Sequence, residues 1–152
     1  MTRSELTEML LGLEIQVRFV SIAEAVALHD DSIGRVGGKP GVRDLALLES
    51  ALHKPMQLCI YQREEDPVVL AAALADGVAQ NHAFLDGNKR TAFLVCQRFL
   101  AKNNVPFDPD VAEAVEVFRR LAAHEIESGE FVVWIRSVSE TPSFHPMPTP
   151  AP

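Results

Sequence analysis

The sequence predicts an all-α, single-domain protein. No segment alternates apolar and polar residues with the period of a β-strand, and several helix starts are recognisable. Two segments, 68–79 and 92–100, are apolar on almost every side, which predicts a pair of central helices because such a helix belongs in the interior of a fold. A length of 152 residues with 47% hydrophobic content is enough for one buried core. We expect about six helices.

The first helix starts are given by capping residues. Ser21 and Glu24 form a capping box, which predicts a helix that runs to about residue 34. His29 lies on the apolar side of this helix and is interpreted as a core or boundary residue rather than a catalytic one. Asp44 caps a short helix that should end before Pro55, with a connection over 57–65.

The later helices follow the same logic. The pair Asp66-Pro67 opens the first central helix, and the second is expected over 88–103. The pair Asp108-Pro109 repeats the start signal, and a last helix is expected over about 130–138. The predicted buried face of the helix after Pro109 consists of Val111, Ala114, Val115, Phe118 and Leu121.

Both ends of the chain differ from the middle. We interpret residues 1–18 as an N-terminal extension, either a short helix or a disordered segment, and 19–138 as the folded domain. Residues 139–152 form a tail with prolines at 142, 146, 148, 150 and 152. Since proline can neither continue a helix nor pair in a sheet, this tail is predicted to be extended or disordered.

Composition restricts the function classes. A net charge of −7 and a pI near 5.2 give no general electrostatic case for binding nucleic acid or an anionic membrane surface. The apolar run at 9–11 is too short for a signal or membrane segment. Cys59 and Cys96 lack CxxC spacing, and with no secretory leader they fit reduced thiols in a cytoplasm.

The polar loop between the two central helices holds the residues suited to chemistry, NHAFLDGNKR over 81–90. Gly87 before a helix start leaves backbone N–H groups pointing at one spot, and Lys89 and Arg90 add two positive charges, so a phosphate site is predicted. His82 is suited to act as a general base near neutral pH, and Asp86 is a hard oxygen ligand for Mg²⁺. This set indicates transfer of a phosphorus group from a nucleotide to a hydroxyl.

The run HAFLDGNKR over 82–90 resembles the signature of the Fic/Doc superfamily and is most similar to its Doc branch. In most Fic proteins the loop continues Gly-Asn-Gly-Arg and has a second arginine three residues later. Here Lys89 replaces the second glycine and Phe93 the second arginine, and both departures are those of the Doc branch. The resemblance covers about 19–137 and implies a Fic/Doc-like helical bundle with the active-site loop at the start of a central helix.

The resemblance also implies residue roles. His82 would take the proton from the target hydroxyl, and Asp86 would hold Mg²⁺ on the phosphates of ATP. The catalytic anion site would consist of Gly87, Asn88, Lys89 and Arg90. Phe84 is expected to anchor the loop in the core. The glycine-rich segment 34–41 would be a flap that holds the target backbone beside the site, with a plain interhelical loop as the alternative.

The Doc branch implies a bacterial or phage toxin that transfers the γ-phosphate of ATP to a hydroxyl of elongation factor Tu and arrests translation. Its implied partner is a Phd-like antitoxin. One alternative is a Fic-type AMP-transferase, against which Phe93 argues, and another is a catalytically silent module that binds a nucleotide or antitoxin. Some Fic proteins inhibit themselves through a Ser/Thr-x-x-x-Glu-Gly/Asn helix. Ser4 and Glu8 have its spacing, but Met9 follows, so self-inhibition is not expected.

Overall fold

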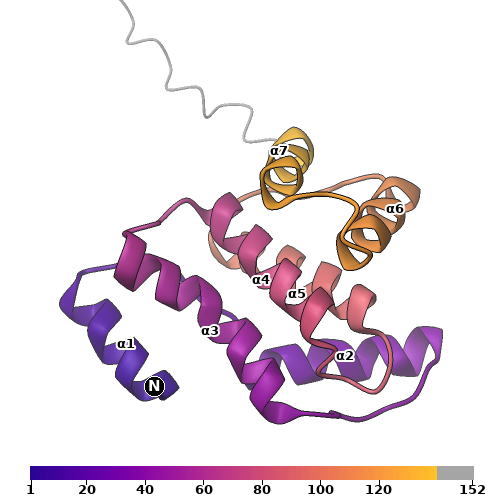
Figure 1. Ribbon diagram of the computed structural model, residues 1–152, viewed down its shortest axis with the longest axis horizontal. Coiled ribbons are helices and arrows are strands. Elements are labelled where there is room, and N and C mark those ends of the chain that lie inside the picture. Colours follow the sequence, from indigo (N-terminus) through magenta and orange to yellow (C-terminus); the bar gives the residue numbers. More distant parts are fainter. Residues whose placement is uncertain (140–152) are drawn as a thin grey trace, which may run out of the picture.

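The computed structural model describes residues 1–139, which form seven α-helices and no β-strand (Figure 1). The prediction of an all-α fold is confirmed. The count exceeds the expected six because residues 1–18 contain a helix, which was one of their two expected forms. The helices are α1 (Arg3–Gly12), α2 (Ile22–Val36), α3 (Leu45–Gln62), α4 (Pro67–Asn81), α5 (Asn88–Lys102), α6 (Val111–Ala122) and α7 (Ser128–Val138).

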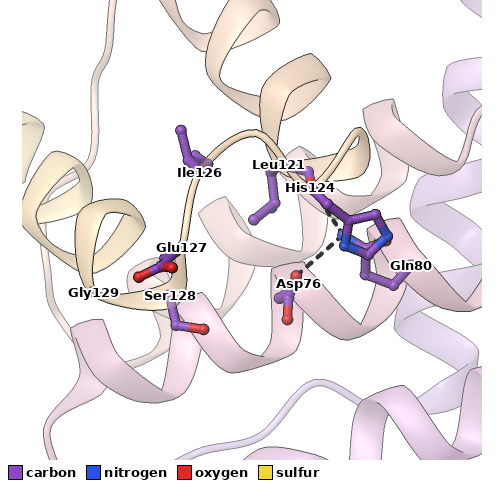
Figure 2. A pocket seen from close by; sticks show the side chains of 8 residues that line it. All are labelled: Asp76, Gln80, Leu121, His124, Ile126, Glu127, Ser128 and Gly129. Atoms are coloured by element: carbon purple, nitrogen blue, oxygen red, sulfur yellow. Dashed lines mark hydrogen bonds between the residues drawn. The ribbon is translucent and has the colours of Figure 1, made fainter.

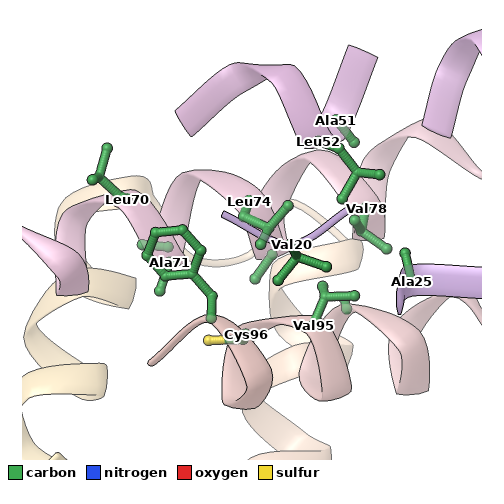
Figure 3. Packing of buried hydrophobic residues seen from close by; sticks show 14 of the residues in the cluster. Val20, Ala25, Ala51, Leu52, Leu70, Ala71, Leu74, Val78, Val95 and Cys96 are labelled. Atoms are coloured by element: carbon green, nitrogen blue, oxygen red, sulfur yellow. The ribbon is translucent and has the colours of Figure 1, made fainter. Parts of the chain in front are cut away.

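The central pair of helices is α4 and α5, as predicted. α4 packs against α3 on one side and against α6 and α7 on another, while α5 packs against α2 (Figure 1). Figure 3 shows Leu74 and Val78 of α4 between Leu52 of α3 and Val95 of α5, and all four side chains are buried. The loop that joins α4 to α5 is therefore held at one end of the core.

The predicted caps at Ser21, Asp44 and Asp66 are confirmed. Each side chain accepts a hydrogen bond from a backbone N–H in the first turn of its helix. Of the three caps, Asp44 lies at the loop between α4 and α5, since its N–H donates to the Ala83 carbonyl at 3.0 Å. No described helix is long and apolar enough to cross a membrane.

The predicted end of α3 before Pro55 is wrong, since the helix continues to Gln62 and only a short turn follows. Proline inside a helix costs about 3 kcal/mol because it removes one hydrogen bond and crowds the preceding turn. Beyond it, however, Met56, Cys59 and Ile60 are all buried. Burial of such side chains contributes about 1.5–3 kcal/mol each, which outweighs the cost of the proline.

The prediction for α6 is wrong in two respects. Its N-cap is Asp110, two residues after the predicted start signal. Ala114, Phe118 and Leu121 are buried as expected, whereas Val111 and Val115 are 75% and 66% exposed. Each residue turns a helix by about 100°, so Val115 lies off the stripe that faces α4 and α5.

The N-terminal segment 1–18 contains a helix that packs on the rest of the fold. α1 packs against α3 and buries Leu6 and Leu10. Its Thr2 cap and Glu5 form a capping box. The predicted proline-rich tail lies, apart from Ser139, outside the described residues.

Candidate active site

The loop 82–87 begins where α4 ends. His82 takes the left-handed backbone conformation there, with φ 50° and ψ 47°, which is uncommon for a residue other than glycine. This turn stops the helix and leaves the His82 side chain exposed. The predicted general base therefore lies at the surface, directly at the end of a buried helix.

Phe84 anchors the middle of the loop, as predicted. Its side chain is 1% exposed and its ring stacks on that of His29, with centroids 3.9 Å apart. The Asn88 side chain braces the same residue: its Oδ1 accepts from the Phe84 N–H and its Nδ2 donates to the Phe84 carbonyl, each at 3.0 Å. The side-chain amide of Asn88 is thus bonded to the loop backbone. The group of Asn88 that remains available to an anion is its backbone N–H.

Asp86 presents an ionised carboxylate beside the start of α5. Hydrogen bonds from the Lys39 N–H (3.1 Å) and the Gly87 N–H (2.8 Å) lower the pKa of Asp86 below its ordinary value. The positive charge of Arg90 acts in the same direction. The carboxylate is exposed, so it is free to bind a cation from solution at neutral pH.

The first turn of α5 lacks a side-chain cap. Its first helical hydrogen bond runs from the Thr91 N–H to the Gly87 carbonyl at 2.9 Å, and Gly87 at the N-cap has no side chain to accept others. The N–H groups of Asn88, Lys89 and Arg90 therefore have no helical partner, and they carry the partial positive charge of the helix dipole. This geometry suits an anion.

Arg90 adds a guanidinium to the same place. Its Nη2 donates to the Gly37 carbonyl at 2.8 Å, and its Nη1 is buried without a hydrogen-bond partner in the described part of the chain. A buried donor that stays unpaired is costly, so an anionic oxygen would complete this group. The predicted residues Asp86, Gly87, Asn88 and Arg90 are thus brought together, while Lys89 is exposed one residue away.

The donor set fits Mg²⁺ bound together with a nucleotide. Residues 1–139 contain no cluster of three or more His, Cys, Asp or Glu side chains able to hold a metal ion alone. Mg²⁺ is commonly held by one or two carboxylates together with substrate phosphates. Asp86 beside an anion site meets that requirement, so Asp86 would hold the ion and the α5 N-terminus the phosphates.

The segment that joins α2 to α3 lies along the loop. An isolated antiparallel bridge pairs Val42 with Phe84, and the Gly41 carbonyl accepts from the Leu85 N–H at 3.1 Å. The Ala83 carbonyl accepts from the N–H groups of Arg43 (2.7 Å) and Asp44 (3.0 Å). The contact of Gly41 places the end of the predicted flap, residues 34–41, beside the loop 82–87.

Two residues contact the loop in a way that the sequence did not predict. His29 is 1% exposed, and its Nε2 lies 2.8 Å from the Asp86 carbonyl oxygen. The Arg43 Nε donates to the His82 carbonyl at 2.7 Å. Thr91, in the first turn of α5, is fully buried.

A cavity of about 490 Å³ lies apart from this loop. It lies between α4, the end of α6 and the start of α7, and Asp76, Gln80 and Glu127 are among its lining side chains (Figure 2). Gln80 donates to the Leu121 carbonyl at 2.7 Å, which ties α4 to α6. None of the predicted site residues lines this cavity.

Comparison with known proteins agrees with the geometry. Residues 19–100, more than half of the chain and including the whole loop, match the Fic/DOC family. The chain belongs to this family. "Protein kinase doc" of Escherichia phage P1 is 35% identical over 99 residues, which cover 64% of this chain and 79% of that protein. "Toxin Doc" of Mycolicibacterium smegmatis (strain ATCC 700084 / mc(2)155) is 38% identical over 95 residues, which cover 60% of this chain and 72% of that protein.

Phe93 occupies the position at which most Fic proteins have a second arginine. Its ring centroid lies 5.9 Å from that of Phe107 and 5.5 Å from that of Phe118. Phe93 therefore belongs to the packing between α5 and α6. It contributes no positive charge to the anion site.

Proposed function

We propose that this chain is a Doc-type toxin, a protein kinase that transfers the γ-phosphate of ATP to a hydroxyl of a protein. One observation carries the proposal: an ionised Asp86 and a partly unpaired Arg90 lie at the uncapped N-terminus of α5, directly after His82. The printed names of the two relatives, a protein kinase and a toxin, support it.

The proposed reaction follows from these groups. His82 takes the proton of the target hydroxyl as its oxygen attacks the γ-phosphorus, and the bond to the bridging oxygen breaks so that ADP leaves. The first N–H groups of α5, with Lys89 and Arg90, stabilise the negative charge on the transferred phosphoryl group. Mg²⁺ bound at Asp86 would neutralise charge on the nucleotide phosphates.

The proposed target is elongation factor Tu, whose phosphorylation would arrest translation in the bacterial cytoplasm, and the proposed partner is a Phd-like antitoxin. A Fic-type AMP-transferase, which would attack the α-phosphorus, is less well supported. The partly buried ring of Phe93 packs against Phe107 and Phe118, at the position where most Fic proteins have a second arginine. A silent binding module is opposed by the exposed His82 and the ionised Asp86.

The test uses elongation factor Tu, Mg²⁺ and ATP labelled at the γ- or the α-phosphorus in separate reactions. We expect label on the target only from γ, and a loss of about a hundred- to ten-thousandfold in rate for His82→Ala. Label from α would instead establish AMP transfer. No label from either, with nucleotide binding intact by titration, would indicate a silent module or another target. Adding an unlabelled bacterial lysate together with the labelled ATP separates these two, because only an active enzyme with another target would label a protein of the lysate.

A further inference from the structure

We propose that Arg43 and His29 are positioning residues that hold the active-site loop at its two ends. Arg43 would set the backbone of His82, and His29 would set that of Asp86. This inference rests on the proposed function, because it concerns the same loop. Both residues belong to segments far from the loop in sequence, 39 and 57 residues away respectively.

Arg43 holds the end of α4. Its Nε donates to the His82 carbonyl at 2.7 Å and its Nη2 to the Asn81 carbonyl at 3.4 Å. The last carbonyls of a helix lack helical partners and carry partial negative charge, so a guanidinium is favourable there. These bonds fix the peptide plane that follows His82 while that residue is in the left-handed conformation. They thereby fix the direction in which the imidazole leaves the chain.

His29 holds the other end. A carbonyl oxygen only accepts hydrogen bonds, so the Nε2 of His29 must carry the proton in its 2.8 Å contact with the Asp86 carbonyl. The ring cannot easily turn away because it is buried and stacked on Phe84 at an interplanar angle of 11°. The bond fixes the peptide between Asp86 and Gly87, which is the junction of the predicted metal ligand and the anion site.

The middle of the loop is held by other groups. Phe84 is buried and bracketed by Asn88, and Leu85 is bonded to Gly41. The two ends carry the side chains of His82 and Asp86. The His82 carbonyl accepts from Arg43, and the Asp86 carbonyl accepts from His29. Loss of Arg43 should therefore affect proton transfer, and loss of His29 should affect binding of the metal and nucleotide.

This difference gives the test. In Arg43→Met, we expect kcat for phosphoryl transfer to fall about ten- to a hundredfold, since displacing a catalytic group by about 1 Å has effects of that size. The affinity for Mg²⁺ and ATP, measured by calorimetry, should change less than twofold. Arg43→Lys keeps a donor and should recover part of kcat. Arg98→Met, at another exposed arginine, controls for the loss of one charge and should leave both values unchanged.

For His29 the informative pair is His29→Leu and His29→Gln. His29→Leu removes the donor and should weaken binding of Mg²⁺ and ATP about tenfold, whereas His29→Gln keeps a donor near Nε2 and should weaken it less. The proposal is overturned if the Arg43 and His29 variants both lower kcat and the affinity for Mg²⁺ and ATP to the same extent. It is also overturned if kcat and affinity are unchanged in both variants. Equal loss in His29→Leu and His29→Gln would show that the ring stack rather than the hydrogen bond matters, and would also overturn it.

A measurement without turnover separates this proposal from the proposed function. Amide hydrogen exchange of Asp44, whose N–H donates to the Ala83 carbonyl directly after His82, should be about tenfold faster in Arg43→Met than in the wild type, while amides in the middle of α4 stay unchanged. If the wild type transfers no phosphate but this acceleration is found, the kinase assignment fails and the positioning role stands. Unchanged exchange at Asp44 overturns the positioning role.

Discussion

Gly38 allows the flap to approach the carboxylate of Asp86 very closely. A Cβ at this position would lie 2.9 Å from the Asp86 Oδ2 and 3.1 Å from the Arg90 Nη2. Its φ of +122° is also a conformation that side-chain-bearing residues rarely adopt. The hydrogen bond from the neighbouring Lys39 N–H, which keeps Asp86 ionised, depends on this approach.

We therefore predict that Gly38→Ala weakens binding of Mg²⁺ and ATP by about tenfold without unfolding the protein. The control is Gly37→Ala, because Gly37 also has a positive φ of +100° but nothing within 4 Å of its Cβ position. Backbone strain is then shared by both variants, and only Gly38→Ala crowds Asp86. Calorimetric titration compares them, and similar affinities for the two variants would contradict the prediction.

In Gly38→Ala, the binding of Mg²⁺ and ATP should also depend on pH differently from that in the wild type. In the wild type the pKa of Asp86 is lowered, chiefly by the hydrogen bond from Lys39. Its anionic form therefore persists as pH falls through the ordinary carboxyl range, and binding of Mg²⁺ should be lost only below that range. In Gly38→Ala the pKa should rise towards its ordinary value, so binding should be lost at higher pH than in the wild type. Titrations with Mg²⁺ and ATP over the acid range measure the difference.

The candidate residues of the loop can be named from local sequence, whereas the contacts of His29 and Arg43 with the loop cannot. His82, Asp86 and Arg90 lie within nine residues, and their types indicate transfer of a phosphorus group from a nucleotide to a hydroxyl. His29 and Arg43 reach the loop only through the packing of α2 and of the segment before α3. Nothing in the local sequence distinguishes such a histidine from an ordinary core residue, since its partner is a backbone carbonyl.

The helices α3 and α4 pack closely at Gly77. A Cβ on Gly77 would lie 3.2 Å from the Cβ of Ala51 and 3.3 Å from its Cα. Both residues lie in the middle of their helices. Small residues at such a crossing let the backbones approach, and a branched side chain would force the helices apart.

We predict that Gly77→Val lowers the free energy of unfolding by about 1–3 kcal/mol through overpacking. The same change at Gly34 serves as control, because Gly34 is also helical but has nothing within 4 Å of its Cβ position. There valine should be neutral or slightly stabilising, since glycine is the poorer helix former of the two. Urea unfolding measures both variants, and equal effects would show that the crossing at Gly77 has room for a larger side chain.

Helix starts were easier to predict than helix ends. The caps at Ser21, Asp44 and Asp66 depend on contacts within three residues, so they can be read locally. The continuation of α3 past Pro55 depends on burial of Met56 and later residues by other helices, which no local rule contains. At these three helices the local sequence predicts the start, whereas at α6 the start signal was two residues early, and at α3 tertiary packing decides how far the helix extends.

The N-terminal helix α1 contributes to the hydrophobic core of the molecule. Leu6 is fully buried and Leu10 is 5% exposed, and both belong to the same hydrophobic cluster as the side chains of α3, α4 and α5. The Arg3 side chain also contacts the segment before α2 and α3 itself, with Nη1 3.4 Å from the Val20 carbonyl and 3.9 Å from the Met56 sulfur. α1 thus closes one side of the core and packs on α3, which separates it from α4 and α5 (Figure 1).

The last prediction tests whether α1 stabilises the fold or restrains the site. Leu6→Ala should lower the free energy of unfolding by about 2–5 kcal/mol, as expected when a leucine is deleted from a core. Leu11→Ala, at a position that is 71% exposed in the same helix, should change it by less than about 0.5 kcal/mol. At a temperature where both variants remain folded, phosphoryl transfer should equal that of the wild type, because α1 packs on α3 and makes no described hydrogen bond to the loop. Faster transfer in Leu6→Ala would mean that α1 inhibits the enzyme, and would restore the self-inhibition that Met9 argues against.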